Sequence, residues 1–255
     1  TVTDLRRLGK RIAIGLTDDL YLVLHLMIAG RLRWSDSPTA RPPGKVGLAA
    51  FGFDHGTLLL TEQGTQHRAT LHVVEGEVGL ATHHPPGVEP LEIDRDTFAD
   101  TLRSENHTIK RALTDPRLFS GIGNAYSDEI LHAARLSPLT WTSRLDDEQI
   151  TQLYQATQSL LRHWVEVLGE RYATKFPGDG AVTAFRKEFA AHGKFGQPCP
   201  TCGTKIQRIR YAENETNYCP RCQTAGKVLA DRSLSRLLKG DWPKSIEELE
   251  AGQVQ

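Results

Sequence analysis

The first part of the chain carries short apolar runs separated by turn residues. These runs cover residues 11–16, 20–28, 45–53, 57–61 and 66–74. Thr17-Asp18-Asp19 and Asp54-His55-Gly56 stand between consecutive runs, and short runs punctuated by Asp and Gly are typical of strands joined by tight turns. The pattern therefore predicts an antiparallel β-sandwich or barrel over residues 1–90.

From about residue 94 the apolar spacing changes to that of helices. We expect helices over 94–104 and 108–113, and a long one over 145–172. The long segment repeats apolar residues with a period near 3.6 (Ile150, Leu153, Tyr154, Thr157, Leu160, Leu161, Trp164, Val165 and Leu168). Acidic residues before it suit a helix N-terminus. This stripe predicts the core of a helical domain over residues 91–195, followed at 175–180 by a loop.

Composition excludes some classes of protein and leaves others open. Hydrophobic residues make up 39% of the 255 residues and charged residues 24%, which is ordinary for a globular protein. No apolar run is long enough to cross a membrane, and no secretory signal is present. Basic and acidic residues are equal at 31 each, but residues 186–227 hold eight basic and three acidic residues. This local positive charge favours nucleic acid as a partner, against a merely solubilising surface.

Two cysteine pairs carry the most specific chemistry in the chain. Cys199-Pro-Thr-Cys202 and Cys219-Pro-Arg-Cys222 are separated by sixteen residues, and the chain has no other cysteine. Two such knuckles close a tetrahedral site for one structural Zn²⁺, and the spacer has room for a hairpin. Disulfides and a redox pair are the alternatives, but disulfides suit secreted chains and redox pairs are rarely doubled. Reduced cysteines without a targeting segment place the chain in the cytoplasm.

A glycine-rich turn precedes another helix. Gly121 and Gly123 allow a sharp turn, and a helix is expected from Asn124, as its N-cap, to Ala134. Free N–H groups at such a start bind phosphate, although a plain helix cap has the same sequence pattern.

Together and in this order, these motifs resemble the formamidopyrimidine-DNA glycosylase and endonuclease VIII family. Residues 121–126 resemble its helix–two-turn–helix signature, residues 198–222 its four-cysteine finger, and residues 6–11 and 25–32 two of its strands. The match covers about residues 2–224. It implies an α+β fold with a truncated N-terminal antiparallel β-sandwich (1–90), a helical domain with a helix–two-turn–helix (91–195) and a zinc-finger β-hairpin (196–227). The C-terminal tail (228–255) goes beyond the usual end of the family. In the tail we expect a helix over 229–250, interrupted near residues 240–243.

The resemblance implies a DNA glycosylase with AP-lyase activity that removes oxidised bases in base-excision repair. Its partner would be double-stranded DNA that contains a damaged base or an abasic site, and we expect a monomer in the bacterial cytoplasm or nucleoid. The nucleophile implied is the amine of an N-terminal proline, assisted by a glutamate. The chain begins at Thr1 without either residue, so we expect a fragment of such an enzyme. The alternative is a catalytically inactive, zinc-dependent binder of damaged DNA.

Carried over position by position, the resemblance implies a set of DNA-binding residues. Lys10 matches a phosphate-binding lysine and Lys110 a lysine near the lesion pocket, with solvated surface lysines as the alternative. Ile28 matches a methionine wedge, with plain sandwich core as the alternative. The complete set is Lys10, His25, Ile28, Lys110, Gly123, Asn124, Tyr126, Arg208, Arg210 and Asn214.

The finger departs from the family pattern at one of these positions. Asn214 stands where the family usually has a phosphate-binding arginine, and asparagine carries no charge. Arg208 or Arg210 is expected to compensate. The choice between oxidised purines and oxidised pyrimidines stays open.

Overall fold

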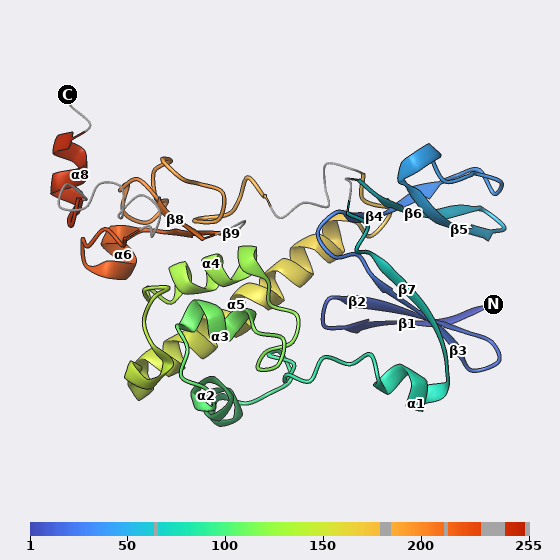
Figure 1. The fold of residues 1–255 in the computed structure, drawn as a ribbon, viewed down its shortest axis with the longest axis horizontal. Coiled ribbons are helices and arrows are strands. Elements are labelled where there is room, and N and C mark those ends of the chain that lie inside the picture. The colour runs from blue at the N-terminus through green and yellow to red at the C-terminus, as the bar shows by residue number, and fades with distance from the viewer. Residues whose placement is uncertain (64–65, 179–184, 212–213, 231–242, 253–255) are drawn as a thin grey trace. The chain divides into compact units, whose positions relative to one another are not determined.

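The computed structural model describes residues 1–63, 66–178, 185–211, 214–230 and 243–252. They form two compact units, which we call the sheet unit (Thr1–Pro85 with Glu166–Thr183) and the helical unit (Pro86–Val165 with Ala184–Gln255). Strands and helices are segregated along the chain, which confirms the predicted α+β class (Figure 1). No helix in the described ranges is long and apolar enough to cross a membrane.

The sheet unit contains two antiparallel sheets. The first has the order β1-β2-β3-β7, formed by β1 (Val2–Leu8), β2 (Arg11–Leu16), β3 (Leu20–His25) and β7 (Thr70–Glu75). The second has the order β4-β6-β5, formed by β4 (Gly30–Ser35), β6 (Gly56–Glu62) and β5 (Gly47–Phe53). A short 3₁₀ turn, η1 (Gly44–Val46), precedes β5.

The two sheets share one core, as in a sandwich. Ile14 and Leu24 of the first sheet pack with Leu58 and Leu60 of the second. The other face of the first sheet is covered in part by helix α1 (Gly76–Ala81), whose Leu80 is fully buried. Helix α1 was not predicted, because six residues are too few to show a helical period.

The turns between strands explain where the strands end. Leu16 pairs with Leu20 across a three-residue turn, in which Asp18 and Asp19 have φ values of 63° and 54°, the left-handed conformation that Asp tolerates better than most residues. The strand predicted to reach residue 28 ends at His25 instead, because Met27 has a φ of 52° and cannot continue a strand. The prediction was therefore wrong by three residues, of which Met27 and Ile28 are exposed in the turn and Leu26 packs in part against the sandwich core.

The helical unit is built around α2 (Arg95–Arg103), α3 (Ile109–Thr114), α4 (Asn124–Ala133) and α5 (Asp147–Arg171), with a 3₁₀ turn, η2 (Thr142–Arg144). Phe98, Leu113, Phe119 and Leu131 belong to its buried core. Ile150, Leu153 and Trp164 of α5 are buried as the stripe predicted, but Val165 is 64% exposed. One residue turns a helix by about 100°, so Val165 cannot share the face of Trp164.

The finger and tail complete the helical unit. β8 (Gln207–Tyr211) and β9 (Asn214–Tyr218) form the expected hairpin, and α6 (Pro220–Thr224) follows. Most of the predicted tail helix lies outside the described residues, and the described part of the tail ends in a short helix, α8 (Ile246–Gly252). The Val228 N–H donates to the Lys244 carbonyl at 3.0 Å, and the Ile246 side chain is buried.

Candidate metal centre and nucleic-acid interface

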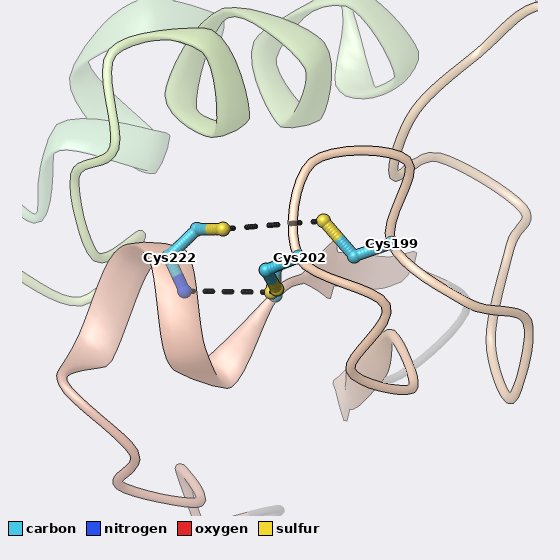
Figure 2. Close-up of side chains that lie close together, drawn as sticks. Cys199, Cys202 and Cys222 are labelled. Atoms are coloured by element: carbon cyan, nitrogen blue, oxygen red, sulfur yellow. Dashed lines mark hydrogen bonds between the residues drawn. The ribbon is translucent and has the colours of Figure 1, made fainter.

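The four cysteines converge as a tetrahedral metal site requires. Their sulfur atoms all lie within 4.8 Å of one another, with 3.4 Å between Cys202 and Cys219 and 4.0 Å between Cys199 and Cys222. Zinc–sulfur bonds of about 2.3 Å in a tetrahedron place the sulfurs about 3.8 Å apart. Figure 2 shows Cys222 on its short helix facing Cys199 across the site. The cluster is a structural site for one Zn²⁺, as predicted.

Local geometry prepares each knuckle for the metal. Helix α6 begins directly after Cys219, and the Cys222 N–H donates to the Cys219 sulfur at 3.4 Å. Burial raises the pKa of Cys219, and it raises the pKa of Cys222 to about 11. Metal binding at these two positions therefore has to displace a thiol proton. Four thiolates leave no open position on the metal, which makes the site structural and not catalytic.

Buried carboxylates of helix α4 join the helices to the finger. The Asp128 side chain is 0% exposed and accepts hydrogen bonds from His192 Nδ1 at 2.7 Å and the Asn217 N–H at 3.1 Å. Glu129 accepts from the backbone N–H groups of residues 190–192. At the far end of α4, His132 Nε2 lies 3.2 Å from the Cys199 sulfur. Helix α4 is thus bonded to the finger along its length.

Lys110 is not the solvated surface lysine that the sequence left open as an alternative. Its side chain is 12% exposed, and its ammonium donates to Asp128 Oδ1 at 2.5 Å and to the Asn124 carbonyl at 2.8 Å. Burial lowers its pKa, and the Asp128 charge opposes that effect. The solvated surface lysine is therefore excluded, and Lys110 holds the first turn of α4 from inside.

The capping role predicted for Asn124 is wrong. Gly123 is the N-cap of α4, and Asn124 is the first helical residue. Its side-chain amide donates instead to the Glu215 carbonyl on β9 at 2.9 Å. Asn124 therefore ties the start of the helix to the finger hairpin, while the first N–H groups of α4 lie outside the helical bonding pattern.

A pocket opens where α3, α4 and the hairpin meet, and we call it the finger pocket. Its volume is about 700 Å³. Lys110, Arg111, Asn124, Arg210 and Asn214 contribute to its lining. No Asp or Glu occurs among the described residues that line it. The pocket therefore offers positive charge and hydrogen-bond donors to an anion.

The two arginines expected to compensate for Asn214 differ in their surroundings. Arg208 lies over the Phe195 ring at 4.0 Å and pairs with Glu215 at 3.3 Å, away from the finger pocket. Arg210 also pairs with Glu215 at 3.3 Å, but its side chain is 59% exposed and lines the pocket beside Asn214. Of the two arginines, only Arg210 lines the finger pocket, and its DNA contact stays a prediction.

Tyr126 points into the helical unit and not into the finger pocket. Its ring packs edge-on against Trp164 and Phe189, with ring centroids 6.3 and 5.6 Å away. Burial raises its pKa, while Arg186 opposes the shift. These contacts explain the position as aromatic packing, and its DNA contact stays a prediction.

The remaining predicted residues belong to the sheet unit. Lys10 lies in the turn between β1 and β2, and its pKa is lowered by the surrounding protein even though its side chain is exposed. His25 ends β3 opposite Arg11, and burial, Arg11 and Lys10 lower its pKa. Ile28 is 79% exposed in the β3–β4 turn, which excludes the alternative that it is sandwich core.

Sequence reasoning missed the residues that join separate segments. These are Asp128, His192 and His132, which contact their partners only once the finger has folded against α4. No short sequence motif indicates such contacts. Arg111 and Trp141 were also missed. Both line the finger pocket. Trp141 follows a Ser-Pro pair in the sequence, and a tryptophan in such a loop was a signal that could have identified it.

The fold and the site define a class of protein: a β-sandwich with a helical segment and a four-cysteine hairpin bonded to it. Two family models match, the formamidopyrimidine-DNA glycosylase H2TH domain over residues 87–175 and the zinc finger found in FPG and IleRS over residues 196–225. The formamidopyrimidine-DNA glycosylase of Pelotomaculum thermopropionicum is 31% identical over 220 residues, which cover 85% of this chain and 79% of the relative. The chain belongs to the formamidopyrimidine-DNA glycosylase family, as the motifs predicted.

Two further relatives are similar to this chain. An uncharacterized formamidopyrimidine-DNA glycosylase-like protein of Mycobacterium tuberculosis is 39% identical over 153 residues, which cover 60% of this chain and 94% of the relative. The structure of a complex between the Lactococcus lactis Fpg and an abasic site containing DNA has a TM-score of 0.76 and 27% identity. The match covers 88% of this chain and 82% of that chain.

Proposed function

We propose that this chain binds duplex DNA that contains a damaged base or an abasic site. The observation that carries the proposal is the finger pocket, where the start of α4 and the zinc hairpin meet around positive charge. Solved relatives that share most of this fold include complexes with an abasic site containing DNA and with a Fapy-dG containing DNA. A DNA backbone is the anion that such a surface fits.

Each part of the pocket has a distinct task in this proposal. Gly123 lets the backbone approach a phosphate at the start of α4, where the first N–H groups and the helix dipole favour an anion. Arg210 supplies the charge that Asn214 lacks, and Asn214 adds a hydrogen-bond donor. Lys110 acts as a positioning residue that holds the Asn124 carbonyl and thereby the direction of these N–H groups.

The sheet unit supplies a second set of DNA contacts. Lys10 and His25 offer positive charge and a hydrogen-bond donor to phosphates. Ile28 presents an exposed apolar side chain at a turn, which is suited to fill the gap that a flipped nucleotide leaves.

As the activity of the family to which the chain belongs, we propose removal of oxidised bases followed by cleavage of the abasic strand. The resemblance implies a proline amine as nucleophile and a glutamate that assists it, and their part in the reaction is proposed together with this activity. The second candidate is a non-catalytic, zinc-dependent binder of damaged DNA. The division into segments 1–90, 91–195, 196–227 and 228–255 is proposed as well. We also propose a place in the bacterial cytoplasm, because the relatives named above are bacterial.

Fluorescence anisotropy with duplexes that differ in one abasic site tests the binding proposal. We expect tighter binding to the abasic duplex and an affinity that falls steeply with salt. Lys10→Ala should reduce the salt slope by about 0.9, the value for one phosphate contact, whereas Lys45→Ala serves as an exposed lysine control in the same unit. Equal affinity for both duplexes at all salt concentrations would refute the proposal.

Borohydride trapping on the abasic duplex separates the two candidates. A covalent adduct requires an amine that forms a Schiff base with the sugar, and its presence would support the glycosylase and lyase. Retained, lesion-dependent binding without an adduct would support the binder for the chain as it stands.

A further inference from the structure

Trp141 is an exposed aromatic side chain on a rigid loop. Its side chain is 44% exposed, and the adjacent Leu139 is 43% exposed. The loop itself is fixed to the start of α3 on both sides of Trp141. The Ile109 N–H donates to the Thr140 carbonyl at 2.8 Å, and the Thr142 N–H donates to the His107 carbonyl at 2.8 Å. A large aromatic surface held in place at no further entropic cost is typical of binding surfaces.

Arg111 provides a cation in the same pocket as this aromatic ring. It follows Lys110 on α3, but it is exposed where Lys110 is buried. Within the described ranges its guanidinium makes no ion pair, in contrast to Arg103 and Arg117, which both pair with carboxylates. Arg111 and Trp141 both line the finger pocket. An arginine without a carboxylate partner and an exposed tryptophan thus share one concave surface.

We propose that Arg111 and Trp141 form a further DNA-contact site in the finger pocket, which holds one nucleotide beside the phosphate bound at the start of α4. The Arg111 guanidinium takes that nucleotide's phosphate, and the Trp141 ring packs against its sugar or base. This inference rests on the proposed DNA binding and extends it with two residues that the motifs did not indicate.

Charge and size favour a nucleotide over other occupants. An acidic peptide would match the cations, but a nucleotide matches the cations and the aromatic ring together, because every base has a face that stacks on tryptophan. A volume of about 700 Å³ also exceeds what a single phosphate group needs. The absence of acidic residues from the described lining removes the repulsion that would oppose a phosphodiester.

The experiment measures binding of the zinc-loaded chain to an abasic duplex. Trp141→Ala should weaken binding about fivefold or more, which is the range for loss of one base–aromatic stack. Trp141→Phe should retain most of the affinity. Arg111→Ala should reduce the salt slope by about 0.9, whereas Arg144→Ala, an exposed arginine outside the pocket, should leave it unchanged. Far-UV circular dichroism and a thermal melt confirm that each variant is folded.

A second readout reports directly on Trp141. DNA should quench part of the tryptophan fluorescence, and that part should be missing in Trp141→Phe, which keeps the fold. Lesion-dependent binding would overturn this site, while the proposed function stands, if Trp141→Ala left the affinity unchanged, Arg111→Ala left the salt slope unchanged and Trp141→Phe left the quenching unchanged. Failure of the unaltered chain to bind the duplex would instead refute the proposed function, and this site with it.

Discussion

Replacement of Asp128 by asparagine is the sharpest test of how the helical unit is held together. Asp128 is fully buried and accepts hydrogen bonds from Lys110, His192 and the Asn217 N–H. Asparagine has nearly the same shape, but it brings no charge and replaces one acceptor oxygen by a donor. The variant Asp128→Asn therefore leaves the buried Lys110 ammonium without its counter-ion.

The size of the effect follows from burial. Removal of one partner of a buried ion pair costs about 3–5 kcal/mol, because the remaining charge is neither hydrated nor neutralised. The pair of Arg103 and Asp147 provides the control, since its Asp147 side chain is 76% exposed. Exposed pairs contribute about 0–1 kcal/mol, so Asp147→Asn should change the free energy of unfolding very little.

Urea denaturation of the zinc-loaded protein measures both variants. In a double-mutant cycle, Lys110→Met combined with Asp128→Asn should be less destabilising than the sum of the two single changes, by about 1–3 kcal/mol. The double variant no longer buries an unpaired ammonium. If Asp128→Asn costs no more than Asp147→Asn, or if the two buried changes are additive, the pair does not hold the helices as described.

Four further outcomes are expected. Zinc removal by a chelator should unfold the finger and weaken DNA binding, while far-UV circular dichroism retains the helical signal, because binding there contributes about 10–16 kcal/mol in isolated finger peptides. Affinity for DNA should rise as the pH falls from about 7.5 to 5.5. The pKa of His25 is lowered in the free protein and a bound phosphate would raise it, so the complex takes up a proton. His25→Gln should abolish this pH dependence in an anisotropy titration. Ile28→Asn should leave the urea midpoint nearly unchanged, since the side chain is 79% exposed, and yet weaken binding to the abasic duplex. Asn214→Arg should tighten binding and steepen the salt slope by about 0.9; an unchanged slope would show that no phosphate lies beside this position.

Local patterns in the sequence predicted most of the fold. The Asp18-Asp19 turn, the α2 and α3 segments and the cysteine knuckles depend on residues close in the chain, so their patterns are visible without coordinates. Strand ends were less accurate, because β3 stops where Met27 adopts a left-handed conformation that no sequence rule assigns to methionine.

The candidate site was only partly predictable, for a physical reason. Lys110 could be recognised as a candidate, but its burial depends on Asp128, which lies eighteen positions further along, and on His192 beyond that. The role of Asn124 as an N-cap was plausible from its position after Gly123, yet Gly123 itself takes the extended N-cap position and the Asn124 amide donates to a carbonyl of the finger. Contacts between segments that are distant in the sequence determine the roles of these two side chains. The periodicity and spacing of residues in the sequence do not predict such contacts.

The carboxylate of Asp128 also constrains how this protein can change over generations. Because three otherwise separate stretches of backbone bind one carboxylate, the effect of a substitution at Lys110 or His192 depends on which residue occupies the other position. Substitutions at these positions should therefore occur together among relatives. A single substitution that one relative tolerates should destabilise another relative that lacks the accompanying change.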